Sequence, residues 1–172
     1  MNRSIWAGIV LAVLSSHWTH AQEKPSKAKT ASVLSQEGGL AFVPHAKNFI
    51  DHTISDQWIR VSENCQIEVG HTLTKDRTRD AHGLTPVFTY RNEGSLAVLR
   101  PELTMYHGKA PIIRLTQRGG GGDSVRTIVE SRYDKRIFTG ISIDLFVNDR
   151  YSASLLEWLT HMSNLCGAPD WR

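Results

Sequence analysis

Membrane-spanning segments, low-complexity composition and a strong charge imbalance are all missing from this 172-residue sequence. Beyond residue 21 no segment approaches the roughly 20 consecutive apolar residues that a membrane helix needs. Six prolines and 13 glycines are too few for a fibrous protein, and 40% hydrophobic residues suffice for a packed core. Lys plus Arg exceed Asp plus Glu by only 20 to 17, and no basic run interleaves with aromatic residues. We therefore expect a globular protein that binds no nucleic acid.

Catalytic and metal-binding motifs are missing as well. Neither HExxH nor GxSxG occurs, and no His–Cys spacing suits zinc. His45 and His52 lie seven residues apart in a segment that could be helical, but unliganded surface histidines are commoner. Asp144 and Asp149 could be imagined as paired carboxylates, but no motif links them. Asp144 alternates with apolar residues and is expected as a solvated residue on the polar face of a strand. We expect no enzyme activity, no metal and no cofactor, with a metal-binding or enzymatic use of the histidines as an alternative.

The first 21 residues have the pattern of a secretory signal peptide. Arg3 supplies the positive charge, Ile5–Leu14 the short apolar region, and Thr19–Ala21 a cleavage site with small outer residues. Cleavage after Ala21 would release an exported, soluble mature chain, which we expect in the periplasm and without a transmembrane segment. An uncleaved N-terminal anchor helix is the alternative.

Cysteine occurs only twice, at Cys65 and Cys166. In an oxidising compartment two cysteines can form one bridge, so we predict a Cys65–Cys166 disulfide. Two free thiols, or one catalytic thiol with an unrelated second cysteine, are the competing interpretations.

A change in composition near residue 40 suggests two parts in the mature chain. Residues 22–39 are polar and Lys-rich, which predicts a flexible tether or, alternatively, a basic arm touching an anionic surface. Residues 40–172 are predicted to form a single β-rich domain, because short segments with alternating polarity follow one another without βαβ spacing. The expected fold is α+β: an antiparallel sheet or sandwich. The candidate strands are Trp58–Ser62, Cys65–Val69, Pro86–Tyr90, Leu96–Leu99, Leu103–Tyr106, Ile112–Gln117, Val125–Ser131 and Ile141–Val147.

One amphipathic helix is predicted near the end of the sequence. Apolar residues recur at helical spacing from Leu155 to Cys166. Ser154 and Glu157 form a capping-box signature, and Gly167 is a stop signal. Cys166 falls on the apolar stripe, and period-2 alternation places Cys65 on the buried face of its strand. The bridge would therefore join this helix to the sheet.

A glycine run offers the one candidate binding loop. It lies between two predicted strands, which suggests a long flexible hairpin with a mobile tip that could become ordered on a partner. A phosphate-binding loop is disfavoured, because such loops precede a helix and the next residues read as a strand. The loop consists of Arg118, Gly119, Gly120, Gly121, Gly122 and Asp123.

Two stretches resemble a known family. SDQWIRVSENCQIEV (55–69) and ISIDLFVNDRYSASLLEWL (141–159), followed by Cys166, look like the N-terminal β-domain of the MotY family of the flagellar T ring. The resemblance covers the ends of the domain and little of residues 72–136. It implies an antiparallel β-domain closed by a cysteine pair, Cys65 and Cys166, that docks on other envelope proteins. The family's C-terminal peptidoglycan-binding domain has no counterpart here, so wall anchoring is not implied.

Three functions follow as hypotheses. The first is an exported, non-enzymatic module that binds other envelope proteins as an accessory of a cell-envelope machine. The second is a periplasmic inhibitor or immunity protein that blocks a cell-wall hydrolase with the glycine loop. The third is the histidine-based enzyme or metal-binding protein.

Overall fold

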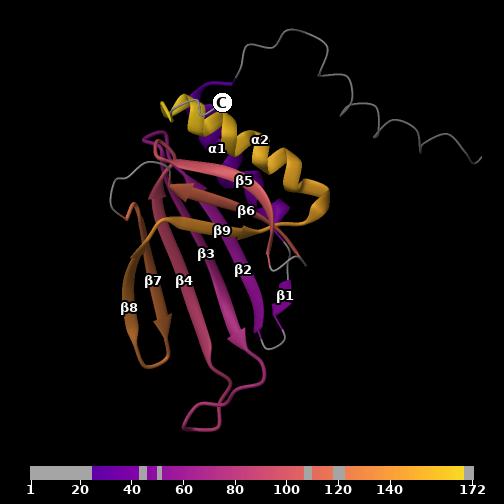
Figure 1. Cartoon of the computed structure of the whole chain (residues 1–172), viewed down its shortest axis with the longest axis vertical. Coiled ribbons are helices and arrows are strands. Elements are labelled where there is room, and N and C mark those ends of the chain that lie inside the picture. The colour runs from indigo at the N-terminus through magenta and orange to yellow at the C-terminus, as the bar shows by residue number, and fades with distance from the viewer. Residues whose placement is uncertain (1–24, 43–45, 50–51, 107–109, 118–122, 169–172) are drawn as a thin grey trace, which may run out of the picture.

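The computed structural model describes residues 25–42, 46–49, 52–106, 110–117 and 123–168. The predicted signal peptide and its cleavage site lie outside these residues. In the described part of the chain, two antiparallel sheets are accompanied by two α-helices and a short 3-10 helix (Figure 1). The predicted α+β class, with antiparallel sheets and a C-terminal helix packed on them, is confirmed.

The larger sheet has six strands and the smaller sheet three. In spatial order the larger sheet contains β1 (Ala46–Phe49), β2 (His52–Val61), β3 (Gln66–Lys75), β4 (Val87–Ser95), β7 (Val125–Ser131) and β8 (Lys135–Gly140). The smaller contains β5 (Leu99–Tyr106), β6 (Ala110–Gln117) and β9 (Ser142–Phe146). The smaller sheet crosses the half of the larger sheet nearest the helices, so the far half of β3, β4 and β7 extends beyond it (Figure 1).

The core lies where the two sheets and the helices meet. Ile67 on β3 and Leu115 and Leu145 on the smaller sheet are completely buried. Gly94 on β4 allows the Leu99 side chain to pack closely against the strand, since a Cβ at Gly94 would lie 2.7 Å from Leu99 Cδ1. Leu159, from helix α2 (Asp149–Leu165), joins the same cluster.

The predicted hairpin around the glycine run is wrong. β6 pairs with β5 and β9, whereas β7 pairs with β4 and β8, so the connection crosses from one sheet to the other. Two alternating segments joined by glycines look alike in sequence whether or not they pair. The strand predicted at Leu96–Leu99 is also wrong at its start, because Leu96–Val98 form the turn into β5. Likewise, His52 belongs to strand β2 rather than to a helix, and His45 is outside the described residues.

The prediction of a flexible tether is wrong from Lys27 onward. Helix α1 (Lys27–Glu37) begins at an N-cap, Ser26, whose hydroxyl accepts the Lys29 N–H at 3.3 Å. Leu34 is fully buried, and the Ser35 hydroxyl contacts both backbone groups of Val61, the N–H at 2.8 Å and the C=O at 3.0 Å. A short 3-10 helix (Gly38–Ala41) follows. This segment therefore packs on β2 as part of the domain.

The disulfide and the C-terminal helix are confirmed, with two corrections. Cys65 and Cys166 are bonded, with their Cα atoms 5.8 Å apart. Cys65 has a φ of 65° in the turn before β3 instead of lying within the strand. Helix α2 begins after Asn148, whose side chain accepts the Arg150 N–H at 3.0 Å, so the Ser154 capping box is not its start. The bond ties the end of α2 to the β2–β3 turn.

Candidate functional site

The predicted binding loop connects the two sheets. Its residues 118–122 lie outside the described residues, and only Asp123 can be placed. The Asp123 carboxylate accepts a hydrogen bond from the Thr139 hydroxyl at 2.6 Å, and the Ser124 N–H donates to the Gln117 side chain at 3.0 Å. These contacts fix both ends of the connection beside strand β8.

A groove of about 520 Å³ lies at the end of the larger sheet that is remote from the helices. The chain between β3 and β4 forms one wall, and the turn between β7 and β8 forms the other; both lie at the far end of the sheet in Figure 1. We call it the distal groove. It is lined by Asp80, Leu84, Thr85, Pro86, Val87, Phe88, Thr89, Glu130, Ser131, Arg132 and Tyr133.

Asp80 holds the two walls together. Its carboxylate accepts the backbone N–H groups of His82 at 2.8 Å and Leu84 at 2.9 Å, which shapes the β3–β4 connection. The Tyr133 hydroxyl donates to the same carboxylate from the opposite wall at 3.2 Å. The backbone hydrogen bond from Leu84, together with those from His82 and Tyr133, lowers the pKa of Asp80. Asp80 is therefore an ionised organiser of the groove at neutral pH.

The surface of the distal groove combines apolar side chains with the carboxylates of Asp80 and Glu130 and with one positive charge, that of Arg132. Leu84, Val87 and Tyr133 are 41%, 46% and 60% exposed. Glu130 forms an ion pair with Lys135, whereas Arg132 has no ion-pair partner among the described residues. Its exposed apolar surface suits the burial of an apolar side chain.

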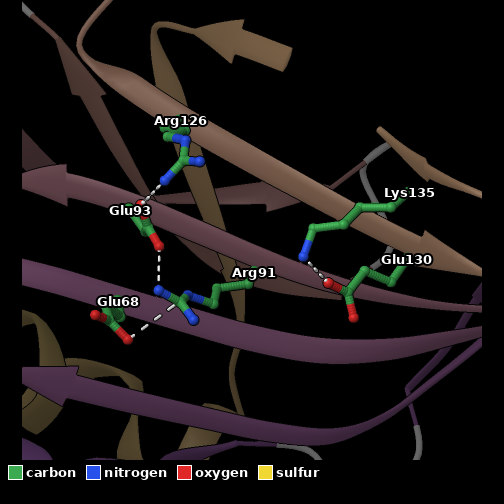
Figure 2. Close-up of polar contacts among 6 residues, drawn as sticks. All are labelled: Glu68, Arg91, Glu93, Arg126, Glu130 and Lys135. Carbon is green, nitrogen blue, oxygen red and sulfur yellow. Dashed lines mark hydrogen bonds and ion pairs between the residues drawn. The ribbon is translucent and has the colours of Figure 1, made fainter. Parts of the chain in front are cut away.

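The outer face of the larger sheet carries charges of both signs (Figure 2). Arg91 pairs with Glu93 and approaches Glu68 to 3.8 Å, while Arg126 donates to Glu93 at 3.0 Å. Burial alone would raise the pKa of Glu93, but the hydrogen bonds and charges of Arg91 and Arg126 outweigh it and lower the pKa. Because these charges largely satisfy one another, this face offers no single-sign patch for a charged ligand.

On the same face Trp58 covers Gly70. A Cβ on Gly70 would lie 2.2 Å from the indole Nε1, and the guanidinium of Arg60 lies 4.9 Å from the ring. We expect Gly70→Ala to displace the indole and lower the free energy of unfolding by about 1–2 kcal/mol. In a Trp58→Ala background the same change should cost less than about 0.5 kcal/mol, because nothing remains to clash. Urea unfolding of the four chains of this cycle measures the coupling, and additive costs would contradict the contact.

The inner face of the larger sheet holds a desolvated histidine. His71 stacks on Tyr90 with the ring centres 4.9 Å apart, and Phe146 meets the pair edge-on at 6.2 Å. Desolvation lowers the pKa of His71 to about 4, although the nearby Asp144 carboxylate acts in the opposite direction. At neutral pH His71 is therefore an uncharged aromatic ring.

Asp144 is engaged in an ion pair rather than merely solvated. Its two oxygens accept from the Arg114 guanidinium at 2.7 and 2.9 Å, which joins β9 to β6. Beside it the Gln57 side-chain amide bonds both the N–H and the C=O of Phe146, each at 3.3 Å. Gln57 lies in the β2 bulge, so its amide takes the place of a neighbouring strand at the edge of β9.

Comparisons with protein-family models, with curated proteins and with solved structures find no match to this chain. Within the described ranges no three His, Cys, Asp or Glu side chains gather closely enough to hold a metal ion. In the same ranges no helix combines the length and apolarity that crossing a membrane requires.

Proposed function

We propose that this chain is an exported, periplasmic, non-enzymatic protein-binding module, an accessory of a cell-envelope machine. The observation that carries the proposal is the distal groove, where Leu84, Val87 and Tyr133 are exposed and which Arg132 also lines, without an ion-pair partner in the described part of the chain. The disulfide supports export, because such bonds persist in oxidising compartments. The resemblance of residues 55–69 and 141–159 to the MotY β-domain agrees with a docking role in the envelope.

The partner that fits the distal groove is a protein segment with an apolar side chain next to an acidic residue. Burial of the apolar side chain against Leu84 and Val87 supplies affinity, and the carboxylate complements Arg132. The hydrogen bonds of Asp80 keep the two walls in place without the ligand, so little ordering opposes binding.

Photo-crosslinking in cells tests this function. A benzoylphenylalanine at Val87 should capture one reproducible envelope protein, and Leu84→Asp should reduce that capture about tenfold or more. Leu103→Asp is the matched control, because Leu103 is similarly exposed, at 47%, on the distant strand β5. Capture that is unchanged by Leu84→Asp, or reduced equally by Leu103→Asp, would contradict the role of the groove. Capture of a cell-wall hydrolase alone would favour the inhibitor hypothesis instead.

A further inference from the structure

Strand β8 is an exposed edge of the larger sheet. It pairs on one side with β7 and ends the strand order on the other (Figure 1). Its apolar side chains point to both faces, and Ile137 and Phe138 are 53% and 50% exposed. An apolar edge strand of this kind is a template for pairing with another strand.

The turn before β8 determines which backbone groups point outward. The Ser131 N–H donates to the Asp134 C=O at 2.8 Å, so these residues form a hydrogen-bonded pair. Hydrogen-bonded and non-hydrogen-bonded residue pairs alternate along two antiparallel strands. The register therefore directs the N–H and C=O of Lys135, Ile137 and Thr139 away from β7. Five of these six groups have no hydrogen-bond partner in the described ranges. The sixth, the Lys135 N–H, donates to the side chain of the preceding Asp134.

We propose that β8 pairs antiparallel with β8 of a second copy of this chain, with a twofold axis at Ile137, so that the two larger sheets become continuous. Such an interface is isologous: the same strand serves both copies. It uses residues 135–139, whereas the distal groove is lined by the β3–β4 connection and the β7–β8 turn.

The sequence of β8 complements itself in this register. Ile137 faces Ile137 of the second copy on the outer face, and Lys135 faces Thr139. On the inner face Arg136 faces Phe138 in a non-hydrogen-bonded pair, where side chains approach most closely and a guanidinium can lie on the ring. Thr139 also holds the exposed carboxylate of Asp123, which brings a negative charge close to Lys135 of the second copy.

Neighbouring registers are less favourable. Centring the axis on Arg136 would place two arginines directly opposite each other, which is destabilising. Centring it on Phe138 would place Lys135 opposite Ile141, whose C=O already accepts the Gln117 N–H at 2.7 Å. Only the axis at Ile137 places Lys135, Ile137 and Thr139 of one copy opposite Thr139, Ile137 and Lys135 of the other.

Sedimentation and light scattering of the purified mature chain test the pairing. The native chain should form a concentration-dependent dimer, and Ile137→Lys should raise its dissociation constant about tenfold or more. Ile141→Lys is the matched control, because Ile141 is equally exposed, at 55%, and lies beyond the paired residues. Circular dichroism and melting temperature establish that each variant remains folded.

Mixing complementary variants tests the axis itself. Ile137→Lys and Ile137→Glu should each be monomeric alone, and an equimolar mixture should dimerise, because a lysine then faces a glutamate across the axis. A native chain that stays monomeric at roughly 100 μM would overturn the inference, since that limits any dimer to about 5 kcal/mol of binding free energy. A dimer that Ile137→Lys does not weaken, or a mixture no more dimeric than its components, would overturn it as well.

Discussion

Replacing Cys65 and Cys166 together by alanine is expected to lower the free energy of unfolding by about 3–5 kcal/mol. The two cysteines are 101 residues apart in sequence, so their bond closes most of the domain into one loop. For a loop of about 100 residues the chain-entropy model gives approximately 4.7 kcal/mol. This is a large fraction of the roughly 5–15 kcal/mol that stabilises an ordinary domain.

The position of the bond also determines which part of the fold should lose stability when it is removed. Cys166 caps helix α2, whose Leu159 and Met162 are completely buried. Cys65 accepts the Leu96 N–H at 2.8 Å through its backbone, which links the β2–β3 turn to the β4–β5 turn. Without the disulfide, α2 is held by packing and by a few hydrogen bonds, such as that from the Ser163 hydroxyl to the Leu99 C=O at 3.3 Å. Its amides should therefore exchange with solvent faster than those of β3 and β4.

Urea unfolding of the oxidised native chain and of the double alanine variant measures this effect. The native chain in excess reductant is the control and should unfold at nearly the same urea concentration as the variant. Single alanine variants should form intermolecular disulfides through the remaining thiol. A loss below about 1 kcal/mol in the double variant would mean that packing, and not the covalent link, holds the helix on the sheets.

Local patterns predicted the elements whose faces differ in polarity. Ile143 and Leu145 alternate with polar residues because β9 has one buried face, and Leu155, Leu159 and Met162 recur at helical spacing because α2 has one buried stripe. Strand β8 was not predicted, because both of its faces are exposed and its sequence carries no alternation. Helix α1 was missed for a similar reason: it buries little apolar surface, around Leu34.

Strand partners depend on contacts that the local pattern does not contain. The alternation in Ile112–Gln117 and Val125–Ser131 is the same in a hairpin as in a crossover between sheets. Leu115 on β6 and Val125 on β7 are buried in the same core, but they come from strands of different sheets, so the two segments meet across the layers and do not pair. The local pattern therefore predicts a hairpin tip at the glycine run, whereas the run connects strands of different sheets.

The distal groove was not predicted, although part of its signal is present in the sequence. Asp80 followed by Gly83 is a turn signature, and Gly83 has the positive φ, 74°, that the turn requires. The opposite wall comes from the β7–β8 turn, about 50 residues later, and the Tyr133–Asp80 hydrogen bond is a tertiary contact. Only the sheet order β3–β4–β7–β8 brings these two turns together.

Acidification is expected to destabilise the fold through His71. Its pKa is about 4 in the folded chain and about 6.5 when unfolded, so the unfolded chain binds the proton more readily. The contribution of His71 to the free energy of unfolding is fully present above pH 6.5. It falls as the pH decreases toward 4 and changes little below that. The shift corresponds to a loss of roughly 3 kcal/mol, close to that expected from the disulfide.

The physical cause lies in the contacts around the imidazole. Tyr90 covers one face of the ring and Phe146 approaches it edge-on, so a charged imidazolium would lose hydration without gaining a strong acceptor. Asp144 is the carboxylate that could stabilise the charge, but both of its oxygens already accept from Arg114. The same burial raises the pKa of Tyr90. Desolvation therefore exceeds attraction at this position.

His71→Phe is the variant that isolates this effect. Phenylalanine retains the stacked ring, so the variant should lose little stability at pH 7.5. Because it removes the titrating group, the variant should lack the loss of unfolding free energy that His71 causes between pH 6.5 and 4. The free energy of unfolding of both chains, measured by urea titration at closely spaced pH values, gives the difference curve. That curve should rise in favour of the variant as the pH falls through this window. Parallel curves would show that His71 is hydrated in the folded protein and that the sheets leave this part of the inner face open to water.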